Sequence, residues 1–225
     1  HEMAAQAERV VALEIDRELV AILQDTIEEA NVSIVECDAL AVDWREVLQE
    51  RGWSGGTVKL VANLPYYITT PLVMKALESF LPFKAVVVMV QREVAERMVA
   101  GPGSKDYGVL SLAVQYYSQA EVVTRVPRSV FYPPPEVDSA VVKLVPCPPS
   151  VSAPREELFQ VIRAAFQQRR KTVRNSLKAL VESWDLSAAD LDEVLEEADI
   201  SGDLRGERLS LNDFSRLTEA LIKRC

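Results

Sequence analysis

The sequence predicts a doubly wound α/β domain followed by a small all-helical domain. Short apolar runs rich in β-branched residues alternate with amphipathic stretches as far as residue 145. This pattern is typical of strands and helices that build a sheet covered on both faces. A proline-rich linker follows at residues 146–154, and no strand pattern appears after it. We therefore predict an α/β domain over residues 1–148 and a helical domain over residues 149–225.

The individual elements follow from the periodicity of the apolar residues. Short apolar runs predict strands at residues 9–16, 32–36, 58–63, 84–91, 121–126 and 139–145. Helical spacing predicts helices at 17–30, 43–51, 70–80, 91–100 and 107–118, and beyond the linker at 155–167, 170–182, 187–198 and 210–224. Ser187 and Ser210 are suitable N-cap residues. The last two strands have no helix between them, so we predict an antiparallel hairpin at the edge of the sheet.

Composition excludes several kinds of chemistry. His1 is the only histidine among 225 residues, so a histidine-activated nucleophile and a histidine-based zinc site have no candidates. The three cysteines, Cys37, Cys147 and Cys225, are too scattered for a disulfide framework and favour the cytoplasm. No apolar run has the length of a membrane-spanning helix. We expect chemistry that depends on carboxylates, amides, aromatic rings or a bound cofactor, with no metal and no membrane.

The stretch from Val58 to Tyr67 is the most informative part of the sequence. Its apolar half predicts a strand buried on both faces, and Pro65 must end this strand near Asn63. Ligands of open α/β sheets bind beyond the carboxyl ends of the strands. The Asn63 amide and a nearby backbone carbonyl can accept hydrogen bonds from an exocyclic amino group, and Tyr66 can stack on a flat ring. The alternative is a turn in which the asparagine caps the next helix and the tyrosines are packing residues.

Two acidic residues lie at the ends of the preceding strands. Glu14 ends the first predicted strand, where an acid commonly accepts hydrogen bonds from ribose hydroxyls. Asp38 follows the second strand, where its carboxylate could accept from an adenine amino group. Taken singly, Glu14 could equally be a surface acid in a loop, and Asp38 could equally be a helix cap. Three polar residues at three successive strand ends, Asn63 included, favour one shared crevice.

One stretch of the chain carries a local excess of positive charge. The formal net charge is −9, which argues against nonspecific nucleic-acid binding over the whole surface. Residues 158–181 nevertheless contain no acid, and such a stripe on an acidic protein is compatible with binding one RNA site. A solvated helix face is the alternative. The basic residues of this stretch are Arg163, Arg169, Arg170, Lys171, Arg174 and Lys178.

Nine consecutive residues carry a resemblance to a known family. The sequence from Asn63 to Pro71, Asn-Leu-Pro-Tyr-Tyr-Ile-Thr-Thr-Pro, resembles the fourth motif of the ribosomal RNA adenine N6,N6-dimethyltransferases. It is most similar to the bacterial branch that acts on small-subunit 16S rRNA. The segments around Glu14 and Asp38 resemble the second and third motifs, and Phe131 to Ser139 resembles the eighth. The resemblance covers essentially the whole chain.

The resemblance implies a Rossmann-like methyltransferase fold that uses S-adenosyl-L-methionine. It implies that Glu14, with Ile15, holds the ribose of the cofactor, and that Asp38, with Ala39, reads the cofactor adenine. Asn63 would belong to the cofactor site and to the catalytic site. The other implied catalytic residues are Leu64, Pro65, Tyr66 and Phe131, with the phenylalanine on the opposite face of the target adenine.

The implied reaction is dimethylation of N6 of two adjacent adenines in a 3′-terminal hairpin of 16S rRNA. The implied partner is this RNA within the small ribosomal subunit, in the cytoplasm, and the protein would act as a monomer during subunit biogenesis. Arg169 to Lys171, Asn175 and residues 205–210 resemble the family's C-terminal domain, where a basic helix contacts RNA. Two alternatives stay open: a large-subunit rRNA adenine methylase, and a non-catalytic RNA-binding or ribosome-assembly factor. A dinucleotide dehydrogenase fits poorly, because the sequence offers neither a glycine turn nor a proton relay.

The family also carries a glycine-rich first motif ahead of the segment where this sequence starts. Residues 1–7 contain no glycine, so we expect the sheet to lack its first strand and turn. A glycine turn lets the backbone approach the bound cofactor closely. We therefore predict weak or absent binding of S-adenosylmethionine by residues 1–225. Calorimetric titration is the measurement, and low-micromolar affinity would contradict this expectation.

Overall fold

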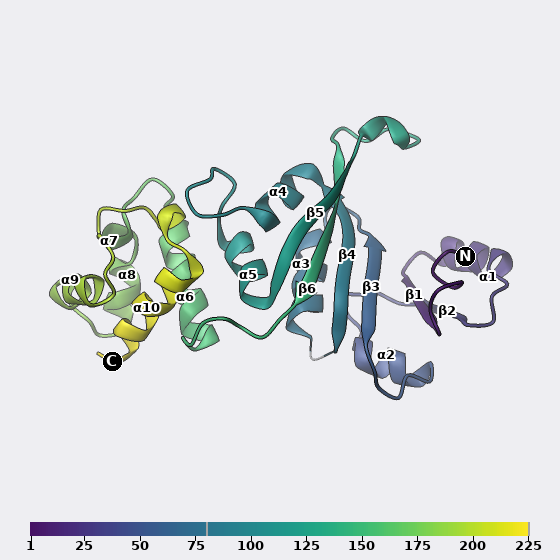
Figure 1. The fold of residues 1–225 in the computed structure, drawn as a ribbon, viewed down its shortest axis with the longest axis horizontal. Coiled ribbons are helices and arrows are strands. Elements are labelled where there is room, and N and C mark those ends of the chain that lie inside the picture. Colours follow the sequence, from purple (N-terminus) through teal and green to yellow (C-terminus); the bar gives the residue numbers. More distant parts are fainter. Residues whose placement is uncertain (80, 225) are drawn as a thin grey trace. The chain divides into compact units, whose positions relative to one another are not determined.

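The computed structural model describes residues 1–79 and 81–224, in two compact units. One unit comprises residues 1–58 and 70–83, and the other comprises residues 59–69 and those from 84 onward. Figure 1 shows the elements. The strands are β1 (Val10–Glu14), β2 (Val32–Glu36), β3 (Val58–Asn63), β4 (Phe83–Gln91), β5 (Ser118–Val126) and β6 (Ser139–Pro146). The α-helices are α1 (Arg17–Thr26), α2 (Trp44–Glu50), α3 (Thr69–Glu78), α4 (Arg92–Val99), α5 (Val109–Tyr117), α6 (Arg155–Gln167), α7 (Val173–Ser176), α8 (Lys178–Ser183), α9 (Ala188–Glu197) and α10 (Leu211–Ile222).

In the first unit, β1 and β2 form a parallel two-stranded sheet. Glu14 lies opposite Glu36, so both strands end at the same edge. Helix α1 begins at once after β1, because the Asp16 carboxylate accepts a hydrogen bond of 2.9 Å from the backbone N–H of Glu18. Strand β1 ends at Glu14, and Asp16 caps α1 two residues later. The polar residues of this segment therefore lie at the carboxyl edge of the sheet.

In the second unit, four strands form a sheet in the order β3-β4-β6-β5. Strand β6 is antiparallel to β4 and to β5, which confirms the predicted hairpin with β5 at the sheet edge. Val86, Val88 and Val90 of β4 are fully buried. Helices α4 and α5 pack against β5, with Met98 and Leu112 in the core. This core fixes the ends of β3 and β6, where the candidate site residues lie.

The helices after the linker pack around α6, which contacts α7, α8 and α10. Both predicted N-caps are confirmed, because the Ser187 and Ser210 hydroxyls accept hydrogen bonds of 3.2 Å from the backbone N–H groups of Asp190 and Asp213. The short 3₁₀ helix η2 (Gly206–Arg208) approaches α6 closely. A Cβ atom on Gly206 would lie 3.0 Å from the Ala165 carbonyl oxygen, so a larger residue here would force the backbone of α6 to shift by a few tenths of an ångström. The domain boundary at residues 148 and 149 stays a prediction.

The prediction that β3 is buried on both faces is wrong. Its residues alternate between partly buried and exposed, and the Val61 side chain is 53% exposed. Strand β3 is the outermost strand of its sheet, so it has a neighbouring strand on one side only within that sheet. An apolar sequence run therefore does not establish burial of both faces of a strand.

The single helix predicted at residues 170–182 is also wrong, because α7 and α8 are separate and residues 168–172 form a turn. The backbone N–H of Val173 donates to the Leu204 carbonyl at 2.7 Å, and that of Arg174 donates to Gly202 at 3.2 Å. These contacts with a distant segment accompany the start of α7 at Val173, and Leu177 separates α7 from α8. Arg170 and Lys171 consequently lie in the turn and not on a helix.

Other element bounds differ from the predictions by a few residues. Helix α1 ends at Thr26 because Ile27 is already extended, with φ −98° and ψ 109°. Strand β5 begins at Ser118, directly after α5, and so includes residues that the alternation of apolar side chains does not reveal. Helix α3 ends at Glu78, and residue 80, where the predicted helix ends, lies outside the described residues.

One buried tyrosine joins the α4–α5 loop to the C-terminal helices. The Tyr107 hydroxyl donates a hydrogen bond of 2.9 Å to the Leu209 carbonyl, and the side chain is fully buried. Nearby, the Gly103 N–H donates to the Glu207 carbonyl at 2.7 Å. Burial, with the negative charge of Asp213 adding to it, raises the pKa of the Tyr107 phenol. The hydroxyl therefore stays a neutral donor.

We expect Tyr107→Phe to lower the free energy of unfolding by about 2 kcal/mol, because the buried Leu209 carbonyl loses its donor. Urea unfolding followed by circular dichroism measures this. Tyr67→Phe is the matched control, since the Tyr67 side chain is exposed and its hydroxyl makes no hydrogen bond with the described residues. Equal stability of the two variants would contradict the role of the buried bond.

Candidate functional site

The turn after β3 presents polar groups that have no protein partner. Asn63 ends the strand, its side chain is exposed, and its amide makes no hydrogen bond with the described residues. The Leu64 carbonyl likewise accepts none from them, while its N–H donates to the Met89 carbonyl at 3.3 Å. Asn63 therefore does not cap α3, which argues against that alternative. Two adjacent acceptors remain available at the end of a strand.

Proline 65 and the residues after it shape this turn. The Pro65 carbonyl accepts hydrogen bonds from the Ile68 N–H at 3.1 Å and from the Thr69 hydroxyl at 3.2 Å. Tyr66 is 40% exposed, and its hydroxyl lies 3.2 Å from the hydroxyl of the buried Ser139. This bond fixes the phenol end of Tyr66 while part of its ring stays accessible. An aromatic ring held in this way can stack on a planar ligand.

The loop that carries Phe131 is fastened to the same part of the second unit. Asp138, next to Ser139, accepts from the Arg128 N–H at 3.0 Å through its carboxylate. Its carbonyl accepts from the Arg92 N–H at 2.9 Å, at the start of α4. The Phe131 N–H donates to the Arg128 carbonyl at 3.3 Å, and the phenylalanine is half-buried. Tyr66 and Phe131 are thus linked through the adjacent residues Ser139 and Asp138.

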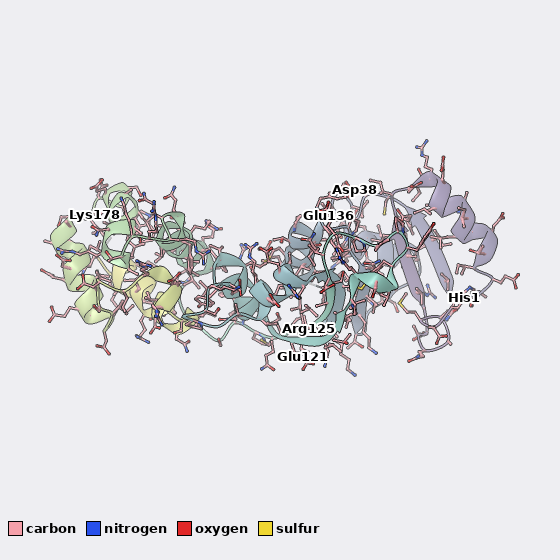
Figure 2. All side chains as sticks on the ribbon, turned by 90° about the horizontal axis from the view of Figure 1, so that it is seen from above. His1, Asp38, Glu121, Arg125, Glu136 and Lys178 are labelled. Atoms are coloured by element: carbon pink, nitrogen blue, oxygen red, sulfur yellow. The ribbon has the colours of Figure 1, made fainter. Side chains whose placement is uncertain are left out.

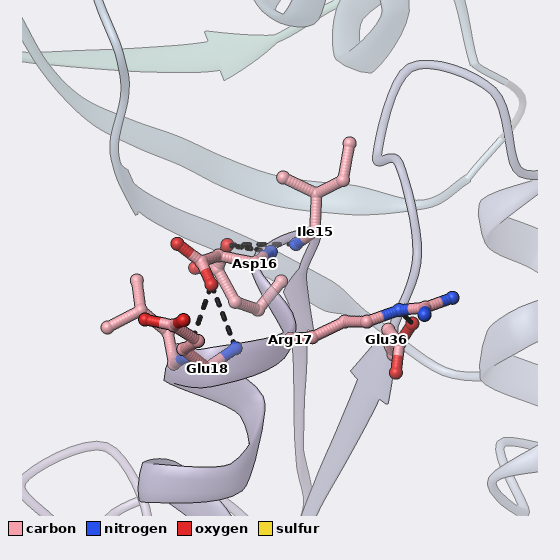
Figure 3. Close-up of polar contacts among 7 residues, drawn as sticks. Ile15, Asp16, Arg17, Glu18 and Glu36 are labelled. Atoms are coloured by element: carbon pink, nitrogen blue, oxygen red, sulfur yellow. Dashed lines mark hydrogen bonds and ion pairs between the residues drawn. The ribbon is translucent and has the colours of Figure 1, made fainter.

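Glu14 holds a defined position at the end of β1. One of its carboxylate oxygens accepts from the backbone N–H groups of Ile15 at 2.8 Å and Asp16 at 2.9 Å, the two residues that Figure 3 labels at this strand end. The other oxygen has no partner among the residues that the structure describes. Figure 3 also shows Arg17, which donates to the Glu36 carboxylate at 2.7 Å and so pairs with a different acid.

Asp38 is held in a similar way beside it. Its carboxylate accepts from the Leu40 N–H at 2.8 Å, and its second oxygen has no partner within residues 1–79 and 81–224. The Cys37 N–H donates to the Glu14 carbonyl at 2.9 Å and so joins the two strand ends. Burial, with the charge of Asp38 adding to it, raises the pKa of the Cys37 thiol. The thiol is therefore poorly suited to act as a nucleophile at neutral pH.

The carboxylates of Glu14 and Asp38 fit a nucleoside. Each has one oxygen fixed by backbone N–H groups and one available oxygen, at the ends of neighbouring parallel strands. Such acceptors can receive hydrogen bonds from ribose hydroxyls and from an exocyclic amino group. Ile15 and Ala39, each adjacent to one of these acids, belong to the same two strand ends.

Sequence reasoning missed Lys75, which shapes the segment around Ala39. Its ammonium group donates to the carbonyls of Ala39 at 3.0 Å, Leu40 at 2.8 Å and Val42 at 2.6 Å. It also lies 5.2 Å from the ring centre of Trp44, whose indole N–H donates to the Ala39 carbonyl at 2.8 Å. No sequence signal identifies this role, because the acceptors are backbone groups brought to α3 by the fold.

The basic residues predicted to contact RNA fall into two groups. Arg169 donates to the carbonyls of Lys105 at 2.9 Å and Tyr107 at 3.4 Å, and Arg174 pairs with Asp192. The other four are exposed and have no ion-pair partner in the described part of the chain. They are Arg163, Arg170, Lys171 and Lys178, of which Figure 2 labels the last.

The site residues lie in both units, with Glu14, Ile15, Asp38 and Ala39 in the first. The residues around Asn63 and Phe131 belong to the second unit. Carboxylates at parallel strand ends, and an asparagine followed by aromatic residues after a strand, are features of α/β proteins that bind nucleosides. Among the described residues, no cluster of three or more histidine, cysteine or acidic side chains could hold a metal ion. The helices described here are also too short or too polar to cross a membrane.

Comparisons with known proteins identify the family. The model of the ribosomal RNA adenine dimethylase family matches residues 1–216. Ribosomal RNA small subunit methyltransferase A of Bacillus pumilus (strain SAFR-032) is 48% identical over 225 residues, covering 99% of this chain and 77% of that protein. The protein of the same name from Bacillus thuringiensis (strain Al Hakam) is 45% identical over 224 residues, covering 98% and 77%. The chain therefore belongs to the ribosomal RNA adenine dimethylase family.

Solved structures agree with this assignment. A dimethyladenosine transferase from Plasmodium falciparum superposes with a TM-score of 0.80 at 26% identity, covering 96% of this chain and 82% of that one. The 23S rRNA methyltransferase ErmE supports the fold alone, with a TM-score of 0.70 at 23% identity and coverage of 98% and 85%. The predicted family, enzyme class and Rossmann-like fold with a helical C-terminal part are confirmed.

We expect Lys75→Met to lower the free energy of unfolding by about 2 kcal/mol, because three carbonyls lose a charged donor. The methionine keeps most of the aliphatic stem, so packing changes little. Chemical denaturation measures the effect. Lys84→Met is the matched control, because Lys84 is exposed on β4 and has no ion-pair partner in the described chain. A Lys75 variant as stable as this control would contradict the assigned role.

Proposed function

We propose that the protein dimethylates N6 of two adjacent adenines in a 3′-terminal hairpin of 16S rRNA. The observation that carries this proposal is the turn after β3, where Asn63 and Leu64 offer free acceptors beside the partly exposed ring of Tyr66. The names of the two Bacillus relatives support a small-subunit substrate. The small ribosomal subunit in the cytoplasm is the corresponding partner and place of action, and the protein would act as a monomer.

The chain's own residues position the target amino group. The lone pair of an adenine amino group is delocalised into the ring, which makes it a poor nucleophile. Acceptance of its two hydrogens by the Asn63 amide oxygen and the Leu64 carbonyl favours a more tetrahedral nitrogen. Tyr66 and Phe131 would hold the ring on its two faces, while Pro65 keeps the turn rigid. Most of the rate enhancement then comes from orientation and electrostatics.

The proposed methyl donor is S-adenosyl-L-methionine, which supplies an electrophilic methyl group when bound. Glu14, with Ile15, would accept from the ribose hydroxyls, and Asp38, with Ala39, would bind the adenine amino group. The available carboxylate oxygens of both acids support these roles. Lys75 would act indirectly, by holding the segment that follows Asp38.

Binding of the RNA backbone would fall to the helical C-terminal part. Arg163, Arg170, Lys171 and Lys178 are exposed and unpaired within the described chain, so they can neutralise phosphates. Arg169 and Arg174 are candidates as well. We expect smaller contributions from these two, because their guanidinium groups are already engaged with the protein.

We expect Asn63→Ala to abolish methyl transfer, because the target amino group loses one of its two acceptors. The assay follows transfer of radioactive methyl groups from S-adenosylmethionine to small ribosomal subunits. Unmodified protein and variant are compared at the same high concentration of S-adenosylmethionine. Asn212→Ala, an exposed asparagine of α10, is the control. Near-normal turnover of the Asn63 variant would rule out this role, and mapping of the methylated adenines separates small-subunit from large-subunit specificity.

A further inference from the structure

A groove of about 590 Å³ lies among the helices of the second unit, away from Asn63 and Phe131. One wall is a single stripe of α6, in which Gln160, Arg163, Ala164 and Gln167 follow helical spacing. The rest of the lining comes from α5, α7 and α8 and from one aromatic side chain of α6. These residues are Val109, Phe166, Ser176, Ala179, Leu180 and Ser183.

The lining has an unusual charge for this protein. All but two of its residues come from the segment 158–181, which contains no acid, although the formal net charge of the chain is −9. Arg163 is the one charged lining residue, and it has no ion-pair partner in the described chain. The groove therefore offers a polyanion the positive charge of Arg163, and no carboxylate lines the groove to oppose it.

The remaining groups suit a nucleotide base. Phe166, Leu180 and the alanines provide an apolar floor, and Phe166 is held by aromatic contacts with Tyr107 and Phe214 at centroid distances of 6.1 Å. Gln160 and Gln167 are exposed amides that can donate to and accept from base edges. The volume lies in the range of small-ligand pockets, and single-stranded RNA is bound by such combinations of apolar surface, amides and cations.

We propose that this groove binds one unpaired nucleotide of the RNA substrate, with its base between α6 and α8 and a neighbouring phosphate at Arg163. This inference rests on the proposed RNA substrate and adds to it a second recognition site, outside the methylation site. The helical part would then distinguish RNA with unpaired nucleotides from a plain duplex. Arg170 and Lys171 would not distinguish these two kinds of RNA, because both kinds present phosphates to a positive charge.

The test compares two alanine-to-tryptophan variants at exposed helix positions. Ala179→Trp fills the groove, whereas Ala189→Trp places the same side chain in the first turn of α9, outside it. Fluorescence anisotropy measures binding of a short RNA hairpin with an unpaired loop and of a fully paired duplex of the same length. We expect Ala179→Trp to weaken hairpin binding about tenfold and to leave duplex binding unchanged. Thermal unfolding of both variants verifies that they fold.

Two further variants identify the chemistry. Double substitution of Gln160→Ala and Gln167→Ala should weaken hairpin binding alone, because base edges lose their amide partners. Arg163→Gln should weaken binding of both RNAs and lower the slope of log affinity against log salt by about one. Equal hairpin affinity of the two tryptophan variants would overturn the groove proposal while leaving the methyltransferase function intact. Failure of the unmodified chain to bind either RNA would overturn the proposed RNA-binding surface as well as the groove.

Discussion

The hydrogen bonds of Asp138 are the constraint on which the second unit's candidate site depends. Through its carboxylate and its carbonyl, this residue joins the Phe131 loop to the start of α4. The next residue, Ser139, contacts the Tyr66 hydroxyl and begins β6. Two neighbouring residues at the start of β6 therefore hold the Tyr66 hydroxyl and the loop that carries Phe131, although Tyr66 and Phe131 lie 65 positions apart in the chain (131 − 66).

A comparable arrangement serves the acids of the first unit, but its donors are different. Glu14 and Asp38 each use one oxygen to bind backbone N–H groups next to them in sequence, which fixes the carboxylate and leaves the other oxygen for a ligand. Lys75 and Trp44 then hold the carbonyl of Ala39 from another direction. Preorganised acceptors of this kind need little rearrangement when a nucleoside binds.

Local chemistry explains which features could be predicted from the sequence. The caps at Ser187 and Ser210 were predictable because both partners of each capping box lie within one turn. The location of Glu14 and Asp38 at strand ends could be predicted because strand and helix patterns alternate along the sequence. The start of α7 at Val173 could not be predicted, because the backbone N–H groups of Val173 and Arg174 donate to distant carbonyls, those of Leu204 and Gly202. The role of Lys75 could not be predicted either, because the backbone carbonyls that accept hydrogen bonds from it come together only in the folded unit.

The bond between Tyr107 and Leu209 also bears on how the protein is made. Its partners are 102 positions apart, so the chain must be synthesised at least as far as Leu209 before the bond can form. Until then, the large phenol of Tyr107 has no acceptor at Leu209, and the α4–α5 loop lacks its anchor. Closing so long a chain segment is entropically costly, which places completion of this unit late in folding. A nascent chain that stalls before η2 would therefore expose core surface of α5 and α6 to chaperones and proteases.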